Sequence, residues 1–150
     1  MLIKIVDDDQ VFVKKIKDIV YDNFKDIFLD YSIECITSNF EAQYFEKGDI
    51  FFLDIDLKEK NGIKIAEEIR ENNSNAIIIF VSAMNDMIFD SLIVQPFYFI
   101  RKDNFDRDMK IACTLIQKYI NKNHKIITLI LMVKNSYSII RYHLFRIVFT

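Results

Sequence analysis

Strand-like and helix-like segments alternate along the first 120 residues of this 150-residue chain. The strand-like segments are short and apolar: LIKIV (2–6), YSIECIT (31–37), DIFFLD (49–54), AIIIFVS (76–82) and FYFIRK (97–102). The helix-like segments place apolar residues at helical spacing and cover 11–24, 40–47, 63–72, 83–94 and 104–122. Such alternation predicts an α/β domain in which helices cover both faces of a five-stranded, mainly parallel sheet.

Polar residues stand at the carboxyl ends of four of these strands. In strand order they are Asp7 and Asp8, Asp54, Ser82 and Lys102. Ligands of doubly wound sheets bind outside the carboxyl ends of the strands, where the strand order reverses. We therefore expect these side chains to meet at one edge of the sheet.

The acids in this set predict a cation site. Three clustered carboxylates repel one another, and their pKa values rise unless a cation joins them. Oxygen ligands favour a hard divalent ion, and Mg²⁺ takes a few carboxylates while it keeps several waters. Asp7, Asp8 and Asp54 can supply the carboxylates, and the main-chain carbonyl of Asp56 can complete the protein ligands.

The remaining two residues indicate phosphoryl chemistry. Lys102 supplies a positive charge that can pair with Asp54 or with oxygens added to it, and the Ser82 hydroxyl can donate a hydrogen bond to the same atoms. A carboxylate beside Mg²⁺, a lysine and a hydroxyl is well placed to attack a phosphoryl group. Catalysis at such a site is mainly positioning and charge stabilisation.

Four motifs together resemble the receiver domain of two-component response regulators. They are VDDD (6–9), FLDIDLKEKNG (52–62), FVSA (80–83) and FIRK (99–102). Each motif is weak alone, but all four in this order are specific. The resemblance covers about residues 1–121 and implies a flavodoxin-like (βα)5 fold with strand order 2-1-3-4-5.

The resemblance also implies roles for individual residues. Asp54 would be the phosphoacceptor, and Asp7, Asp8, Asp54 and the carbonyl of Asp56 would hold Mg²⁺. Ser82 would be the switch hydroxyl, Lys102 the catalytic lysine, and Phe99 the aromatic that turns inward on activation. A phosphoryl group adds charge and acceptor oxygens, which would shift the population of two packings.

Partners follow from the same resemblance. A sensor histidine kinase would donate the phosphoryl group, and the protein would catalyse only its own phosphorylation and dephosphorylation. The responding surface would comprise the fourth predicted helix, the fifth strand and the fifth helix, through which a homodimer is expected.

Arg101, next to Lys102, is interpreted as a solvated strand-end residue.

The sequence also departs from the family pattern. Asp103 follows Lys102 where proline is usual, which predicts a trans peptide there. Lys58 replaces another frequent proline. The spellings LDIDLKEKNG and PFYFIRK look most like receivers attached to LytTR-type DNA-binding domains.

Charge separates the chain into an acidic body and a basic tail. Residues 1–120 carry 15 bases against 22 acids, a net charge of −7, whereas residues 121–150 carry +5 and no acid. We expect 122–150 to be an irregular tail, the truncated or frameshifted start of a LytTR-type domain. Its charges would give only non-specific attraction to DNA, so direct DNA binding by this chain is not expected.

The apolar runs and the cysteines of the sequence indicate where in the cell the protein is expected. No apolar run reaches the ~20 residues that span a bilayer, and the early acids exclude a signal peptide. Cys35 and Cys113 have no metal-ligand spacing and are predicted to be buried in a cytoplasmic protein.

Two other functions compete with the phospho-accepting receiver. One is a pseudo-receiver that serves as an unphosphorylated docking or dimerisation module, against which the complete set of site residues argues. The other is a phosphatase of the haloacid dehalogenase type, because D-I-D at 54–56 resembles its nucleophile motif. That motif normally ends the first strand and is followed by late acids, but residues 109–150 contain none.

Overall fold

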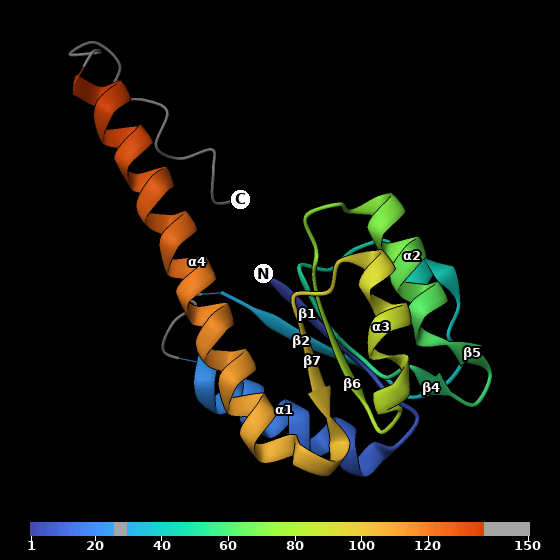
Figure 1. Ribbon diagram of the computed structural model, residues 1–150. Coiled ribbons are helices and arrows are strands. Elements are labelled where there is room, and N and C mark those ends of the chain that lie inside the picture. Colours follow the sequence, from blue (N-terminus) through green and yellow to red (C-terminus); the bar gives the residue numbers. More distant parts are fainter. Residues whose placement is uncertain (26–29, 137–150) are drawn as a thin grey trace. The chain divides into compact units, whose positions relative to one another are not determined.

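The computed structural model describes residues 1–25 and 30–136, with side chains up to residue 123 (Figure 1). Residues Met1–Cys113 form one compact unit. Its centre is a five-stranded sheet with every pairing parallel and the order β2-β1-β3-β6-β7. The strands are β1 (Leu2–Val6), β2 (Ser32–Ile36), β3 (Ile50–Leu53), β6 (Ile77–Ser82) and β7 (Tyr98–Arg101). The predicted fold class and strand order are confirmed.

The central strands are buried on both faces. Every residue of β3 and β6 is buried, which explains why these segments are continuous apolar runs rather than alternating ones. Phe51 and Ile78 are register partners, as are Leu53 and Phe80, and all four belong to the core on one face of the sheet. Because the two strands pair in this register, Asp54 and Ser82 leave the sheet at the same edge.

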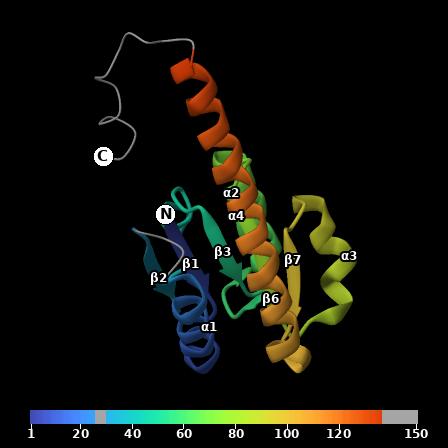
Figure 2. The same ribbon diagram turned by 90° about the vertical axis from the view of Figure 1, so that its left-hand side faces the viewer.

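Three of the described helices are much longer than one turn, and two of these begin at side-chain caps. α1 (Gln10–Phe24) starts at Asp9, whose carboxylate accepts the Val11 N–H. α2 (Gly62–Asn72) starts at Asn61, whose amide oxygen accepts the Ile63 N–H. α4 (Phe105–Ser136) follows β7. Figure 1 shows α1 and the first turns of α4 on one side of the sheet and α2 on the other, and Figure 2 turns the view toward the α1 side.

The helix predicted at 40–47 is wrong. Only a single 3₁₀ turn, Ala42–Tyr44, forms there. The buried apolar residues of this segment are Phe40 and Phe45, and residues five apart lie on different sides of an α-helix. β2 at the sheet edge is therefore poorly covered, and Cys35 is exposed rather than buried as predicted, whereas Cys113 is buried.

Lys4 binds the 3₁₀ turn Ala42–Tyr44, which forms in place of the predicted helix. It lies on β1, is 5% exposed, and was not recognised from the sequence as a core residue. Its ammonium hydrogen-bonds to the Tyr44 carbonyl and lies 3.1 Å from Oε2 of Glu34 on β2. A buried ammonium needs such partners, because burial without them is costly.

The segment predicted as a helix at 83–94 is broken into three short pieces. They are the 3₁₀ turn Asn85–Met87, α3 (Ile88–Ser91) and the 3₁₀ turn Leu92–Val94. Gln95 ends them in the left-handed conformation. The guanidinium of Arg70 on α2 donates to the Val94 and Gln95 carbonyls at 3.1 and 3.3 Å, which satisfies the end of this segment.

α4 continues past the predicted boundary at 122. The expected irregular tail is therefore helical over 122–136, whereas 137–150 lie outside the described residues. No glycine or proline occurs between Phe105 and Ser136 to end the helix. In the described ranges, no helix combines the length and apolarity that crossing a membrane requires.

A small hairpin between β3 and α2 was also not predicted. β4 (Asp56–Leu57) and β5 (Lys60–Asn61) pair antiparallel around the two residues Lys58 and Glu59. Leu57 is buried and anchors the hairpin to the core on the α2 side of the sheet. This hairpin holds Asp56 and Lys58 beside the carboxyl end of β3.

Substitution of Phe51 by Ala tests the core. Phe51 is fully buried on β3, so its removal should lower the free energy of unfolding by about 3–5 kcal/mol through lost burial and a residual cavity. Phe89→Ala is the matched control, because Phe89 is 82% exposed and should change stability by less than about 0.5 kcal/mol. Urea denaturation measures both, and equal midpoints for the two variants would contradict this core.

Candidate functional site

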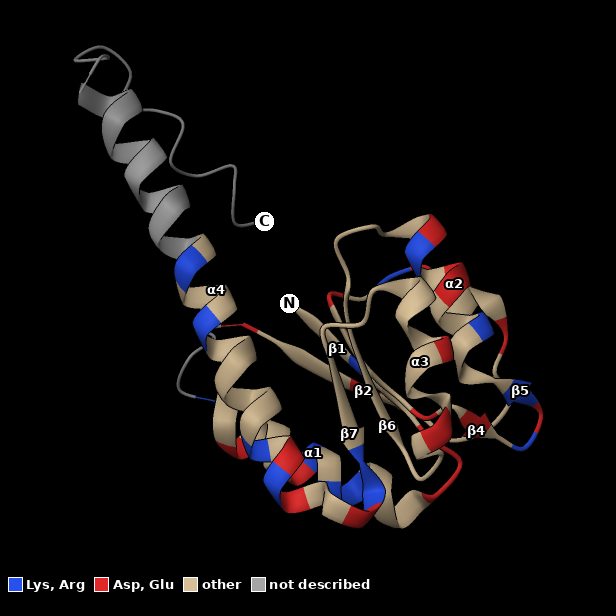
Figure 3. Cartoon of the chain, viewed as in Figure 1, with Lys and Arg blue, Asp and Glu red and all other residues tan. Residues whose placement is uncertain are grey.

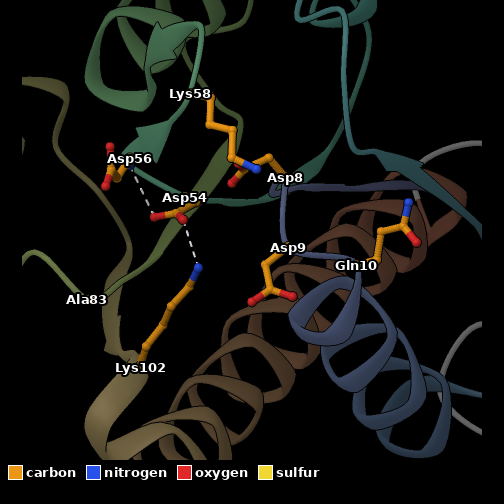
Figure 4. Close-up of a pocket in the computed structure, with 8 residues that line it drawn as sticks. All are labelled: Asp8, Asp9, Gln10, Asp54, Asp56, Lys58, Ala83 and Lys102. Carbon is orange, nitrogen blue, oxygen red and sulfur yellow. Dashed lines mark hydrogen bonds and ion pairs between the residues drawn. The ribbon is translucent and has the colours of Figure 1, made fainter.

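The polar residues predicted from the strand ends meet at one edge of the sheet. Asp7 follows β1, Asp54 follows β3, Ser82 ends β6, and all three are buried. Lys102 follows β7 and reaches back toward the acids (Figure 4). Figure 3 shows acidic residues gathered on the segments that leave this edge. A cavity of about 520 Å³ opens there, lined by the eight residues labelled in Figure 4.

Lys102 holds two of the acids together. Its Nζ lies 2.7 Å from Oδ2 of Asp54 and 2.7 Å from Oδ2 of Asp7. Burial lowers the pKa of this ammonium, but the hydrogen bond to Asp54, the close contact to Asp7 and the negative charges of both acids outweigh burial, so its pKa is raised. Lys102 therefore stays protonated well above neutral pH. On another side, Nζ lies 4.6 Å from the centre of the Phe12 ring of α1, a cation–π contact.

The backbone around Asp54 keeps its carboxylate in place. The Asp54 N–H donates to the Val6 carbonyl at 2.8 Å, which continues the β1–β3 ladder by one residue. Oδ1 accepts the N–H of Asp56 at 3.2 Å, and Oδ2 belongs to the pair with Lys102. Both oxygens are thus held from different elements, the hairpin and the end of β7.

Asp7 is the most buried acid and is incompletely satisfied. Its Oδ1 accepts the N–H of Asp9 at 2.8 Å. Its Oδ2 has the Lys102 ammonium nearby, but that contact lacks the alignment of a hydrogen bond. Burial raises the pKa of this carboxyl, the negative charge of Asp54 raises it further, and the contacts to Lys102 and Asp9 offset only part of the rise.

Asp8 is the more open acid of the pair that follows β1. Its side chain is 17% exposed, and Oδ2 lies 3.0 Å from Nζ of Lys58 in the β4–β5 turn. This contact to Asp8 raises the pKa of the Lys58 ammonium. The sequence alone indicates Lys58 only as a replacement for proline, because its pairing with Asp8 joins different elements.

The carboxylates fit a divalent ion. Oxygens of Asp7, Asp8 and Asp54 all lie within 4.8 Å of one another. Hard oxygen donors of this number suit Mg²⁺, and a buried Asp7 oxygen without an aligned donor is the kind of atom that a cation would satisfy. The backbone N–H of Asp56 faces Asp54, and the exposed side chain of Asp56 points away (Figure 4).

Ser82 and Phe99 lie where the sequence placed them, with local contacts. The Ser82 hydroxyl is fully buried and accepts the Met84 N–H at 3.3 Å, so it caps the segment that follows β6. Phe99 on β7 is half-buried, and its ring centre lies 6.2 Å from that of Phe80 on β6. No cis peptide occurs among the described residues, which confirms the trans bond predicted between Lys102 and Asp103.

The interpretation of Arg101 as a solvated residue is wrong. Its guanidinium donates two hydrogen bonds to the buried Asp108 of α4, at 2.7 and 3.0 Å. The backbone N–H of Arg101 donates to the same carboxylate at 3.2 Å. This fork geometry ties the end of β7 to the first turn of α4, directly beside Lys102. Because the two residues are seven apart and on different elements, no local pattern predicted the pair.

Gly62 is another site residue that sequence reasoning missed. It is the first residue of α2, and its N–H donates to the Ile55 carbonyl. A Cβ at this position would lie 1.9 Å from the Asp54 carbonyl oxygen and 2.8 Å from its carbon. Glycine is therefore needed so that α2 can begin directly against the backbone of Asp54.

Comparison with known proteins decides the family. Residues 3–114 match the model of the response regulator receiver domain. The chain belongs to this family. The receiver domain of two-component response regulators thus accounts for most of the chain, and the resemblance seen in the four sequence motifs is confirmed.

Individual relatives agree with this assignment. Over 119 residues the receiver is 28% identical to the sensory transduction protein LytT of Bacillus anthracis, a match that spans 79% of this chain and 47% of LytT. It shares its fold with a CheY-like receiver domain protein of Methanospirillum hungatei at 22% identity and a TM-score of 0.64, covering 81% of this chain and 97% of the other.

A third relative carries ligands. The response regulator TrrA of Thermotoga maritima, solved in complex with Mg²⁺ and BeF, is 25% identical with a TM-score of 0.55. The match covers 76% of this chain and 97% of TrrA. The bound groups are properties of that protein.

Gly62→Ala tests the close approach of α2 to Asp54. In an open helix this change would stabilise the protein by up to about 1 kcal/mol, but the clash with the Asp54 carbonyl should cost about 1–3 kcal/mol and reverse the sign. Lys64→Ala, on the exposed side of the same helix, should be near neutral. A Gly62→Ala variant that is more stable than the parent in urea would contradict the close approach.

Asp7→Asn tests whether the ionised carboxylate of Asp7 lowers the stability of the folded protein. Because the pKa of Asp7 is raised above 3.8 on folding, the folded state binds this proton more tightly than the unfolded chain does. Ionised Asp7 therefore costs stability at neutral pH, and that cost disappears as pH falls through the raised pKa. We expect Asp7→Asn to be more stable than the parent at pH 7 in EDTA, with a difference that shrinks toward pH 4. A destabilised variant at pH 7 would contradict this.

Proposed function

We propose that this receiver accepts a phosphoryl group on Asp54, with Mg²⁺ held by Asp7, Asp8, Asp54 and the main-chain carbonyl of Asp56. The observation that carries the proposal is the position of Asp54: a buried carboxylate 2.7 Å from a lysine, with two further carboxylates within 4.8 Å. A buried charged group is costly in free energy unless other charges compensate it. Charged groups in such settings cluster at functional sites.

In the proposed reaction, a carboxylate oxygen of Asp54 forms a bond to phosphorus while the bond from phosphorus to the donor breaks. From a histidine kinase the leaving group is the imidazole nitrogen, and from acetyl phosphate it is acetate. The bound Mg²⁺ would neutralise charge on the transferred oxygens. Lys102 is fixed by Asp7, Asp54 and Phe12, so its ammonium needs no reorganisation to stabilise the same charge.

The phosphoryl group would then change the packing near β6 and β7. Ser82 would exchange its bond with the Met84 N–H for one to a phosphoryl oxygen. Phe99 is only half-buried beside Phe80 and would move inward as the loop after Ser82 shifts. This is a shift between two populations rather than a rigid lever.

The surface beside these residues supports a role in recognition. Phe89, Leu92 and Ile93 around α3 are 82%, 55% and 72% exposed. Exposed apolar residues gathered in one segment are typical of interaction sites. We propose that this surface, with β7 and the start of α4, mediates homodimerisation when the receiver is phosphorylated.

The setting and output are proposed from the family. The phosphoryl donor would be a sensor histidine kinase in the cytoplasm, and regulation of transcription would be the outcome. The receiver would comprise residues 1–121, and 122–150 would be the truncated or frameshifted start of a LytTR-type output domain. The match to LytT spans about half the length of that protein.

Intact mass spectrometry tests the proposed chemistry. After incubation with Mg²⁺ and acetyl phosphate, the protein should gain a single phosphoryl group, whereas Asp54→Asn and an EDTA-treated sample should gain none. Because Asn cannot form the acyl phosphate but keeps the shape of the side chain, it is the matched control. A folded, Mg²⁺-binding protein that gains no mass would favour the docking-module function. Turnover of a phosphate ester would instead favour the phosphatase.

A further inference from the structure

The three carboxylates of the site form ion pairs with two different lysines. Lys102 pairs with Asp54 and Asp7, and Lys58 pairs with Asp8. Lys102 is 13% exposed and is surrounded by two acids and the Phe12 ring. Lys58 is 83% exposed, and among the described residues Asp8 is its ion-pair partner. The two ammonium groups are therefore held to very different degrees.

This difference matters when a divalent ion approaches. Asp8 presents its Oδ2 to Lys58, and the same carboxylate belongs to the cluster that fits a cation. Besides these three carboxylates, those of Asp9 and Asp56 line the cavity, so the total charge of the site stays negative with either cation. A divalent ion bound at Asp8 would lie close to the Lys58 ammonium, which contacts the same carboxylate. Like charges this close repel, so the ion and Lys58 compete for Asp8.

We propose that Lys58 is a displaceable counter-ion of the cation site, which neutralises Asp8 until a divalent ion binds and thereby lowers the affinity of the site for Mg²⁺. The inference rests on the Mg²⁺ site of the proposed function. Lys58 is a positioning residue here, because it acts on the ion through Asp8.

The hairpin keeps Lys58 in reach of Asp8. Lys58 stands in the turn between β4 and β5, and Leu57 before it is buried in the core. Figure 4 shows the Lys58 side chain pointing toward Asp8. When it leaves Asp8, the exposed ammonium is hydrated by water and its long side chain regains conformational freedom, so release is easy. Lys102 is only 13% exposed and contacts two acids, so it cannot leave its partners as easily.

Removal of Lys58 should therefore tighten Mg²⁺ binding. An exposed ion pair of this kind corresponds to an affinity change of about two- to fivefold, so Lys58→Met should lower the Kd for Mg²⁺ by that factor. The titration uses the full chain and Mg²⁺ alone at constant ionic strength, and it follows the backbone amide signals of residues 54–56 by NMR. This readout needs no phosphoryl transfer.

Two variants control the experiment. Lys60→Met removes the same charge from the same hairpin, but Lys60 forms no ion pair with Asp8 in the part of the chain described here, so its effect on Kd should be clearly smaller. Lys58→Arg keeps a cation that can reach Asp8 and should retain the weaker affinity of the parent.

The outcomes separate this inference from the proposed function. Tighter binding in Lys58→Met, with parent-like binding in Lys58→Arg, supports the counter-ion. An unchanged Kd in Lys58→Met, or an equal gain in Lys60→Met, overturns it while the Mg²⁺ site stands. If neither the parent nor any variant shifts its amide signals with Mg²⁺, both the inference and the Mg²⁺ site of the proposed function are wrong.

Discussion

The pairing of Lys102 with Asp54 and Asp7 is the interaction on which the site depends. Two carboxylates buried at the edge of a sheet would repel each other and lose hydration, and one ammonium 2.7 Å from both offsets these costs. The balance is incomplete, because the pKa of Asp7 remains raised. The fold thus keeps a site in which a further positive charge is favourable, and the proposed Mg²⁺ ion would supply that charge.

The contacts around Asp54 and Lys102 explain why the two side chains are held in place. Asp54 is held by the β1–β3 ladder and by the N–H of Asp56, and α2 presses against its carbonyl at Gly62. Lys102 is placed by the end of β7, which the Arg101–Asp108 fork ties to α4. Each partner therefore stands on a rigid element, so the charges are organised before any substrate arrives. By contrast, Lys58 lies in a two-residue turn and its side chain is 83% exposed.

Two parts of the molecule are less tightly built than the site. The segment after β2 forms only a single 3₁₀ turn, and Lys4 satisfies its carbonyl from within the sheet. The segment after β6 is broken into short turns, and Arg70 holds its end. The second of these segments adjoins Ser82 and Phe99, where a change of packing is proposed. A segment with few long-range contacts can switch at low cost.

The amino-acid sequence alone determined the five strands and the residues at their carboxyl ends, because continuous apolar runs and the polar residues that follow them are local signals. The strand order was implied by the resemblance that the four motifs carry. Only the tertiary structure decided the rest. The helix at 40–47 failed because Phe40 and Phe45 face the core five residues apart. The Arg101–Asp108 fork, the approach of Gly62 to Asp54 and the pairing of Lys58 with Asp8 join different elements. Such contacts depend on how the elements pack, and no spacing within one segment encodes them.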